Sequence, residues 1–311
     1  MAILRQLPIF GCTLEWRDYC LGGTWMVSGK TKIVGLLGWP VEHTLSPAIQ
    51  NAAFGAAGLD FVYVAFPVRP EELPQAIAGA KALGLAGLNV TVPHKVNIMP
   101  FLDGIDRSAR LVGAVNTVVF EADRAIGYNT DLDGFINSLM AEDVAIADKR
   151  AILLGAGGAA RAIVCGLQDN GILSVTVGTR DASRAQAFAA TFGQDRAVYG
   201  LGWRESEFVE ALGDCDILVQ CTPVGMYPYA SEAVLLDWEK LKSQAVVCDL
   251  IYNPPVTQFL RQAAAAGHKT VGGAGMLVEQ GAAAFTLWTG IPAPKATMYQ
   301  VMTEALAAER L

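Results

Sequence analysis

The chain has 311 residues, of which 52% are hydrophobic and 17% charged, so it is long enough for two domains and lacks the composition of a disordered protein. The net charge of −7 and the lack of a lysine or arginine cluster argue against a nucleic-acid-binding surface. No apolar run is long enough to span a bilayer, and the six cysteines have no metal-ligand spacing. We therefore expect a cytoplasmic protein with reduced thiols, no bound metal, and no nucleic-acid or membrane partner.

Residues 1–29 form a poorly defined N-terminal extension. They show no apolar periodicity, and they lack the basic start, apolar stretch and small-residue cleavage site of a signal peptide. Met26 stands just before the first convincing strand. Two interpretations stay open: a start site assigned upstream of the true one, or a genuine N-terminal arm.

From Lys32 onward, strand and helix patterns alternate, which is typical of a largely parallel sheet with helices on both faces. Ser46 and Pro47 supply an N-cap and a first-turn proline for a helix to about Ala57. Strands are expected at Ile33–Gly38, Phe61–Val68 and Gly87–Val92, with a hairpin-like pair at Gly113–Phe120 and Ala125–Tyr128. Further helices are expected at Glu71–Leu83, Val96–Leu102 and Asp106–Leu111.

The stretch AILLGAGGAARA at Ala151–Ala162 combines a buried strand, a glycine turn and the start of a helix. Gly155, Gly157 and Ala160 fit the G-x-G-x-x-G/A pattern of dinucleotide-binding turns. The first glycine permits the tight turn, the second lets backbone N–H groups approach a pyrophosphate, and the small third residue lets helix and strand pack closely. The alternative is a tight glycine turn of an α/β protein that binds no nucleotide.

A helix at Asp131–Asp143 leads into this turn. Strands are then expected at Ala151–Leu154, Val175–Val177, Ile217–Gln220, Val246–Leu250 and Lys269–Val271, followed by helices at Met276–Thr289 and Lys295–Leu311. The last two helices are expected to cross back and brace the first domain. We therefore predict an α/β fold with two domains and a cleft between them. Residues 30–130, completed by 276–311, form a mainly parallel substrate domain, and residues 131–275 form a Rossmann-type NAD(P)-binding domain.

Several strands of the first domain end in polar residues, where open α/β sheets bind their ligands. Lys95 follows a strand and a proline, which suits a partly desolvated amine that exchanges a proton; the alternative is a solvated lysine. Asp131 opens a helix, where N-capping alone would explain it. Asn116 stands among apolar residues and needs a hydrogen-bond partner, while Thr44 and Ser46 offer hydroxyls for an anion or for helix capping.

The chain resembles the shikimate/quinate dehydrogenase family from about Lys32 to its C-terminus. The resemblance is carried, in the family's order, by EHTLSPAIQNAAF, GLNVTVPHK, GAVNTV, GYNTDLDGF, LLGAGGAARA, TPVGM, CDLIYNPPVT and GMLVEQGAAAFTLWTG. It implies an oxidoreductase, a shikimate dehydrogenase that reversibly reduces 3-dehydroshikimate to shikimate with NADPH, in the pathway to chorismate and the aromatic amino acids. Such an enzyme would bind small acids and would be a monomer or a homodimer.

The resemblance also implies roles for single residues. Lys95 and Asp131 match the family's catalytic pair, which supplies positive charge and a proton where negative charge builds. The substrate carboxylate would bind Thr44, Ser46 and Tyr252, and the ring hydroxyls would bind Thr91, Asn116 and Gln280. The cofactor would bind Gly155, Gly157, Gly158, Ala159, Thr179, Arg180, Arg184, Met226 and Gly273.

Two positions depart from the family's pattern. Thr44 stands where serine is usual, which keeps open whether quinate is accepted beside shikimate. Asp181 stands where a neutral threonine is usual; Arg180 and Arg184 favour the 2′-phosphate of NADP, whereas Asp181 would repel it and suit the ribose hydroxyls of NAD. We expect NADP, with NAD or dual use as the alternative. A non-catalytic ligand sensor is the alternative to an enzyme.

Overall fold

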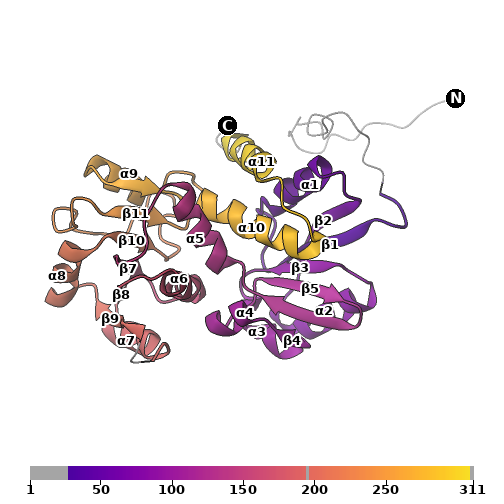
Figure 1. Cartoon of the computed structure of the whole chain (residues 1–311), viewed down its shortest axis with the longest axis horizontal. Coiled ribbons are helices and arrows are strands. Elements are labelled where there is room, and N and C mark those ends of the chain that lie inside the picture. The colour runs from indigo at the N-terminus through magenta and orange to yellow at the C-terminus, as the bar shows by residue number, and fades with distance from the viewer. Residues whose placement is uncertain (1–26, 194–195, 309–311) are drawn as a thin grey trace.

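A computed structural model describes residues 27–193 and 196–308, which form two six-stranded sheets with helices on both faces of each (Figure 1). The predicted N-terminal extension lies outside the described residues up to position 26. This architecture confirms the predicted α/β fold class.

The first sheet is mixed, and its strand order is β2-β1-β3-β5-β6-β4. Its strands are β1 (Lys32–Gly38), β2 (Phe61–Pro67), β3 (Gly87–Val90), β4 (Gly104–Ile105), β5 (Thr117–Glu121) and β6 (Arg124–Tyr128). β1, β2 and β3 are parallel, whereas β5 runs antiparallel to both β3 and β6. The register pairs Asn89 with Thr117 and Thr117 with Tyr128. The residues that follow β3 and β6 therefore lie beside the residues that precede β5, at one edge of the sheet.

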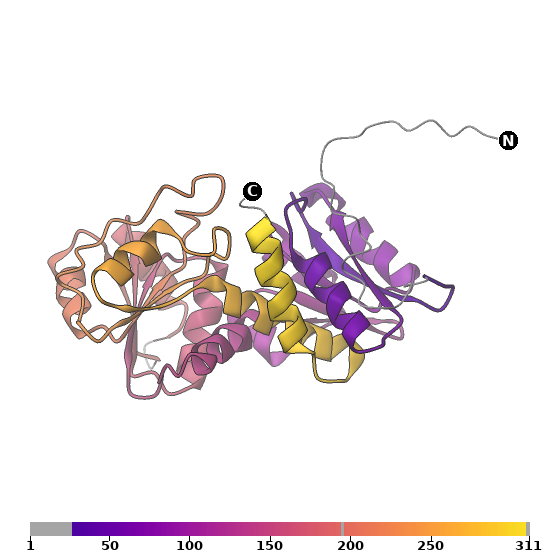
Figure 2. The same ribbon diagram turned by 90° about the horizontal axis from the view of Figure 1, so that it is seen from above.

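Helices from both ends of the chain cover this sheet. The helices before β6 are α1 (Ser46–Ala56), α2 (Leu73–Ala82), α3 (His94–Asn97) and α4 (Arg107–Val112), with 3₁₀ turns at Pro70–Glu72 and Met99–Phe101. One face packs against α1 together with α10 (Gly273–Thr289) and α11 (Lys295–Ala308). The other face packs against α2 and α4. The predicted return of the last two helices to the first sheet is confirmed (Figure 2).

The second sheet is entirely parallel, with the order β12-β11-β10-β7-β8-β9. Its strands are β7 (Arg150–Leu154), β8 (Ser174–Thr179), β9 (Val198–Gly202), β10 (Ile217–Gln220), β11 (Val246–Asp249) and β12 (Lys269–Val271). Its helices are α5 (Asp131–Ala141), α6 (Gly158–Asp169), α7 (Ala182–Ala190), α8 (Ser206–Asp214) and α9 (Gln258–Ala265). The strand order reverses between β7 and β10. Ligands of open α/β sheets bind at such a switch point, and here β7 ends in the glycine turn.

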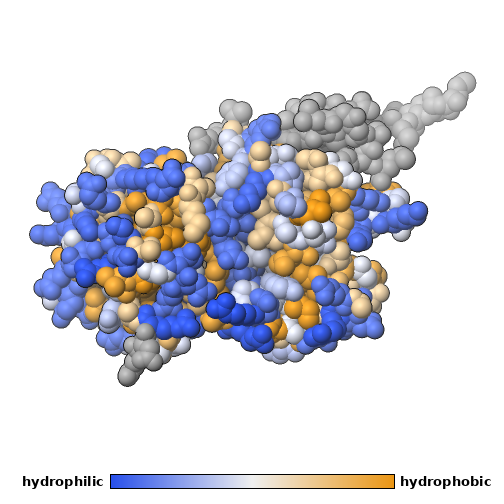
Figure 3. Space-filling model, viewed as in Figure 1, coloured by the Kyte–Doolittle hydropathy of each residue, from blue (hydrophilic) through white to orange (hydrophobic). Residues whose placement is uncertain are grey.

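Helix α10 belongs to both cores. Met276, in its first turn, packs in the core of the second sheet. Val278, Phe285 and Trp288, further along the same helix, pack in the core of the first sheet. Figure 3 shows polar and apolar residues interspersed over the face that it draws, on both halves of the molecule.

Two local predictions were wrong, and one strand was not predicted. The Ser46 hydroxyl does not cap α1: Ser46 is the first helical residue, and its own N–H donates to Thr44 Oγ1 at 3.2 Å. The strand expected from Gly113 begins only at Thr117, because Gly113 ends α4 in the left-handed conformation with φ of 69°. β9 was not predicted, because two glycines interrupt the apolar pattern of VYGLG.

Candidate active site

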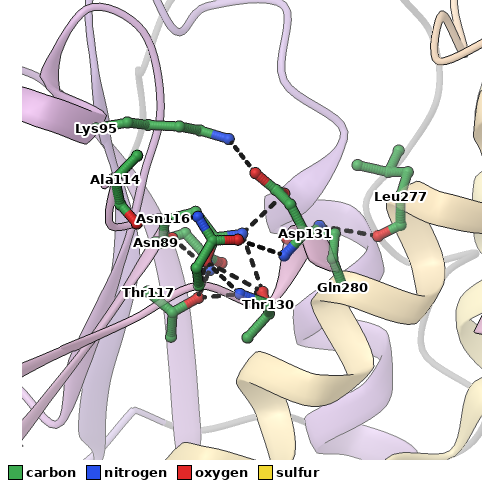
Figure 4. A network of polar contacts seen from close by, with 10 residues as sticks. Asn89, Lys95, Ala114, Asn116, Thr117, Thr130, Asp131, Leu277 and Gln280 are labelled. Atoms are coloured by element: carbon green, nitrogen blue, oxygen red, sulfur yellow. Dashed lines mark hydrogen bonds and ion pairs between the residues drawn. The ribbon is translucent and has the colours of Figure 1, made fainter. Parts of the chain in front are cut away.

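Lys95 and Asp131 form an ion pair at the polar edge of the first sheet (Figure 4). Lys95 lies in α3, just after β3, and Asp131 is the first residue of α5, just after β6. The Lys95 Nζ atom lies 2.7 Å from Asp131 Oδ2, and the two side chains are 30% and 10% exposed. The ammonium group is therefore held beside a carboxylate at the boundary between protein and solvent.

Asp131 does not serve as a helix cap. Its backbone N–H donates to Asn129 Oδ1 at 3.1 Å, so Asn129 satisfies the start of α5. The second oxygen of the Asp131 carboxylate, Oδ1, accepts from Asn116 Nδ2 at 2.8 Å. The capping explanation of Asp131 is wrong, since both carboxylate oxygens bind side chains of the site instead.

Asn116 is fixed in one orientation by its neighbours. Its Oδ1 accepts from the backbone N–H of Thr130 at 2.8 Å and from the Thr117 hydroxyl at 3.0 Å. Its Nδ2 donates to Thr130 Oγ1 at 3.0 Å as well as to Asp131. The loop that carries Asn116 is tied to Lys95, because the Val115 N–H donates to the Lys95 carbonyl at 2.7 Å. The sequence prediction that Asn116 is buried and hydrogen-bonded is confirmed.

Two other predicted substrate residues, Thr91 and Gln280, lie on separate elements. Thr91 is half-buried beyond β3, and Gly38 makes room for it, because a Cβ atom at Gly38 would lie 2.3 Å from Thr91 Cγ2. Gln280 in α10 lies against the first turns of α5, where a Cβ atom at Gly134 would lie 2.7 Å from that of Gln280. Figure 4 shows Gln280 approaching Asp131 from the side opposite Lys95.

A cavity of about 640 Å³ opens between the two sheets. Its lining comes from the β1–α1 loop, from the segments after β10 and β11, and from α9 and α11: His43, Tyr227, Asn253, Pro254, Pro255, Val256, Arg261 and Leu306. His43 is adjacent in the chain to Thr44, and Asn253 is adjacent to Tyr252. The rings of His43 and Tyr227 approach each other edge to face at 6.5 Å between centroids. The cavity therefore adjoins the predicted carboxylate-binding residues.

The glycine turn after β7 has the shape that a dinucleotide requires. Gly155 has φ of +112°, a conformation that residues with side chains rarely adopt. Cβ atoms at Gly157 and Gly158 would meet nothing within 4 Å, so open space faces the start of α6. Gly273 packs so tightly that its Cβ would lie 2.2 Å from the Leu250 carbonyl oxygen. Gly157, Gly158 and the following Ala159 can therefore present free backbone N–H groups to a pyrophosphate.

The end of β8 carries the residues predicted to select the cofactor. Arg180 and Arg184 are exposed, and Thr179 donates its hydroxyl to the Asp181 carbonyl at 2.5 Å. Asp181 caps α7, because its Oδ1 accepts from the Ser183 hydroxyl at 2.8 Å and from the Ser183 N–H at 3.0 Å. These hydrogen bonds lower the pKa of Asp181, so the carboxylate is charged at neutral pH. The structure thus gives Asp181 a structural task at the turn.

In the described ranges 27–193 and 196–308, no three His, Cys, Asp or Glu side chains cluster as metal ligands. The four cysteines in these ranges are free thiols. No helix among the described residues is long and apolar enough to cross a membrane.

Sequence reasoning missed the buried residues behind the pair. One hydrogen-bond network, part of which is drawn in Figure 4, joins Asn116 to four further polar residues: Asn89, Thr117, Thr130 and Tyr63. Asn89 and Thr117 are polar residues on strands whose neighbours are apolar, which is the one signal that the sequence offers.

The fold and the site define a two-domain dinucleotide-binding oxidoreductase, with a glycine turn on one sheet and a lysine–carboxylate pair on the other. Three family models match along the chain: the shikimate dehydrogenase substrate binding domain over residues 36–118, shikimate/quinate 5-dehydrogenase over 138–267, and the shikimate 5'-dehydrogenase C-terminal domain over 273–303. The chain belongs to the shikimate dehydrogenase family, as its motifs predicted.

Individual relatives agree with the family models. The chain is 46% identical to shikimate dehydrogenase (NADP(+)) of Methanocaldococcus jannaschii over 86% of this chain and 94% of that protein. It superimposes on a crystal structure of shikimate dehydrogenase in complex with NADP+ with a TM-score of 0.85 and 42% identity, covering 90% of this chain and 98% of the other. A Listeria monocytogenes shikimate 5-dehydrogenase in complex with shikimate and NAD gives a TM-score of 0.83 at 33% identity, covering 89% and 98%.

Proposed function

We propose that this protein is a shikimate dehydrogenase that catalyses the reversible NADP-dependent conversion of 3-dehydroshikimate to shikimate. The observation that carries the proposal is the Lys95–Asp131 pair at the polar edge of the first sheet, with 2.7 Å between Nζ and Oδ2. Membership of the family and the NADP(+) names of its relatives support the substrate and the cofactor.

The two domains divide the work in this proposal. Residues 30–130 with 276–311 bind the substrate, and residues 131–275 bind NADP. Thr44, Ser46 and Tyr252 hold the carboxylate, while Thr91, Asn116 and Gln280 bind the ring hydroxyls. Gly155, Gly157, Gly158, Ala159, Thr179, Arg180, Arg184, Met226 and Gly273 hold the cofactor, and the open space at Gly157 and Gly158 fits its pyrophosphate.

Lys95 is the proton donor of the reduction. When bound, NADPH would supply the hydride to the carbonyl carbon of 3-dehydroshikimate. Negative charge then develops on the carbonyl oxygen, and the Lys95 ammonium group stabilises that charge and delivers the proton. Asp131 keeps the ammonium group oriented through the 2.7 Å contact, and Asn116 keeps Asp131 oriented. In the oxidation direction the same amine accepts the proton.

The experiment that tests the function is a set of initial rates with shikimate and quinate, each with NADP+ and with NAD+. We expect the highest kcat/KM with shikimate and NADP+. The second candidate is a dehydrogenase that also uses quinate or NAD, favoured by the extra methyl group of Thr44 and by the charge of Asp181. Comparable rates with quinate or NAD+ would favour it, and no turnover in any combination would refute both.

Replacing the proton donor separates an enzyme from a ligand sensor. In Lys95→Ala we expect kcat to fall by about 10²- to 10⁴-fold, the usual contribution of a positioned acid or base. Shikimate binding, measured by calorimetry, should persist in the same variant. An unchanged rate in Lys95→Ala would contradict the assignment of the proton donor.

A further inference from the structure

The cavity between the two sheets has a permanently charged side chain in its lining. Among the described residues that line it, Arg261 of α9 is the one lysine or arginine, and there is no aspartate or glutamate. The rest of the lining consists of two rings, an amide, prolines and aliphatic side chains. Because an arginine keeps its charge at every physiological pH, this lining favours an anion over a cation.

The guanidinium group of Arg261 is held on one side and open on the other. Its Nε donates to Oε1 of Gln258, three residues earlier on the same helix, at 3.3 Å. The Arg261 side chain is exposed, and within residues 27–193 and 196–308 no carboxylate forms an ion pair with it. Its charge is therefore not neutralised by a partner there, and its terminal N–H groups can bind an acceptor.

The proposed substrate brings a negative charge for which its predicted binding residues provide no countercharge. Thr44, Ser46 and Tyr252 would hold the carboxylate through hydroxyl groups, which are neutral. Lys95 is already paired with Asp131 at 2.7 Å. The molecule as a whole has a net charge of −7, so its overall field opposes the approach of an acid. A positive charge near the carboxylate site would offset both effects.

The cavity places Arg261 beside that carboxylate site. His43, which lines the cavity, directly precedes Thr44 in the chain. On the opposite wall, residues 253–256 line the cavity and directly follow Tyr252. An acid that binds Thr44 and Tyr252 therefore lies next to the space that the guanidinium group faces.

We infer that Arg261 is a specificity-determining residue for the negative charge of the substrate. Its guanidinium group attracts the carboxylate into the cavity and offsets its charge, while the neutral hydroxyl groups fix its position. The inference rests on the proposed function, in which the substrate is a carboxylic acid; Arg261 takes no part in hydride or proton transfer. An attraction at an exposed site weakens as salt is added, whereas a packing contact does not.

The test is Arg261→Gln, which removes the charge and keeps a polar side chain. At about 0.02 M salt we expect kcat/KM for shikimate to fall about three- to fivefold, the usual size of a charge interaction at an exposed site. At about 0.5 M salt the fall should shrink to less than about 1.5-fold, because salt then screens exposed charges more than about 4 Å apart. The kcat should stay within about twofold, since the loss is in the capture of the acid.

Two further variants separate the local charge from structure and from net charge. Arg261→Lys keeps the positive charge, so its kcat/KM should stay within about twofold of that of the unmutated protein. Lys240→Gln is the matched control, because it changes the net charge equally at an exposed residue. Lys240 precedes β11, so it lies at the opposite edge of the second sheet from the cavity, and its loss should change kcat/KM less than about 1.5-fold.

Several outcomes would overturn the inference: an unchanged kcat/KM in Arg261→Gln, the same fall at both salt concentrations, an equal fall in Lys240→Gln, or an Arg261→Lys variant as impaired as Arg261→Gln. The proposed function fails separately, if the unmutated protein does not oxidise shikimate. In that case the affinity for shikimate, measured by calorimetry in the same variants and salt concentrations, tests whether Arg261 attracts the acid.

Discussion

Asp181 caps α7, but its negative charge would oppose the binding of a 2′-phosphate. Its carboxylate caps α7 through both the hydroxyl and the N–H of Ser183, and the charge stands between Arg180 and Arg184 in the sequence. A cap needs an oxygen acceptor but not a negative charge, since asparagine caps helices as well as aspartate does. The charge and the cap can therefore be separated by a single substitution.

In Asp181→Asn we expect the KM for NADP+ to fall by about threefold, because a like charge no longer opposes the 2′-phosphate at this exposed site. The KM for NAD+, which has no such phosphate, should change less than about twofold. The measurement is steady-state kinetics at low salt and at about 0.5 M salt. At the higher concentration, the screening length for exposed charges falls to about 4 Å. A gain for NADP+ that is equal at both salt concentrations would contradict a charge effect.

Asp249 is a buried carboxylate that holds a loop of the site. It is 1% exposed at the end of β11, where Oδ2 accepts from the Thr257 hydroxyl at 2.6 Å and Oδ1 from the Ile251 N–H at 3.0 Å. These bonds join the two ends of the segment that carries Tyr252. Burial raises the pKa of Asp249 from 3.8 to about 6, more than the hydrogen bonds lower it.

Because the folded protein binds this proton more tightly than the unfolded chain does, the contribution of Asp249 to stability falls as the pH rises from about 4 to about 6. Asp249→Asn removes the charge. We expect it to raise the free energy of unfolding at pH 7.5 by about 1 to 3 kcal/mol, and to have little effect near pH 4, where the carboxyl group is already protonated. Urea unfolding at both pH values measures this, with Asp123→Asn, in an exposed hairpin turn, as the control. A gain of equal size at both pH values would contradict it.

At the scale of single residues, the sequence predicted Lys95, Asp131 and Asn116 as site residues but not the polar residues behind them. Lys95, Asp131 and Asn116 were recognisable because each is a polar residue in a short motif. Tyr63, Asn89 and Thr117 lie on three different strands, and their hydrogen bonds depend on strand order and register, which local patterns do not specify. The capping role expected for Ser46 was wrong, because Ser46 is the first helical residue and its N–H donates to the Thr44 hydroxyl.

Among the secondary-structure elements, the crossing of α5 and α10 decides where Gln280 lies. Gly134 allows the two helices to touch: a Cβ atom there would lie 2.7 Å from Gln280 Cβ and 2.9 Å from the Gln280 backbone nitrogen. The nearest atoms include backbone, which a rotamer change cannot move. A side chain at this position must therefore separate the helices and displace Gln280 from Asp131.

Gly134→Ala should lower the free energy of unfolding by about 1 to 3 kcal/mol, the usual cost of overpacking. It should also reduce kcat/KM for shikimate by at least about tenfold, since a displacement of about 1 Å at a site is costly. Gly79→Ala is the matched control in α2, where a Cβ meets nothing within 4 Å. There we expect a gain of about 0.5 to 1 kcal/mol from helix propensity and no change in rate. Equal behaviour of the two variants would contradict the crossing argument.

The elements themselves followed from the sequence wherever apolar runs were uninterrupted. β10 and β12 begin and end at the predicted residues. β9 was not predicted from the sequence, because Gly200 interrupts its apolar pattern. This glycine is required by the close packing of α7 on the strand, since a Cβ atom there would lie 2.3 Å from the Ala185 carbonyl carbon and oxygen. Helix α10 begins three residues before Met276, where its start was predicted, because the glycine-rich sequence before Met276 is typical of a loop.

For the molecule as a whole, α10 makes the two cores dependent on each other. Met276 is buried in one core and Phe285 in the other, so neither sheet can lose its covering without disturbing the same helix. We expect a single cooperative unfolding transition in calorimetry, and NADP+ at about 100 times its Kd should stabilise the whole molecule by about 2.7 kcal/mol. Two separate transitions, of which NADP+ shifts only one, would contradict this dependence.

The same placement of α10 and α11 bears on how the chain folds as it is made. The core of the first sheet takes residues from β1, α1 and β2, but it is closed only by side chains such as Phe285, Met298 and Val301. On the ribosome these emerge after the whole second sheet. The order of synthesis is therefore not the order of completion: all strands of both sheets are synthesised before the two helices that cover one face of the first sheet, so that face stays exposed until the end of the chain is made.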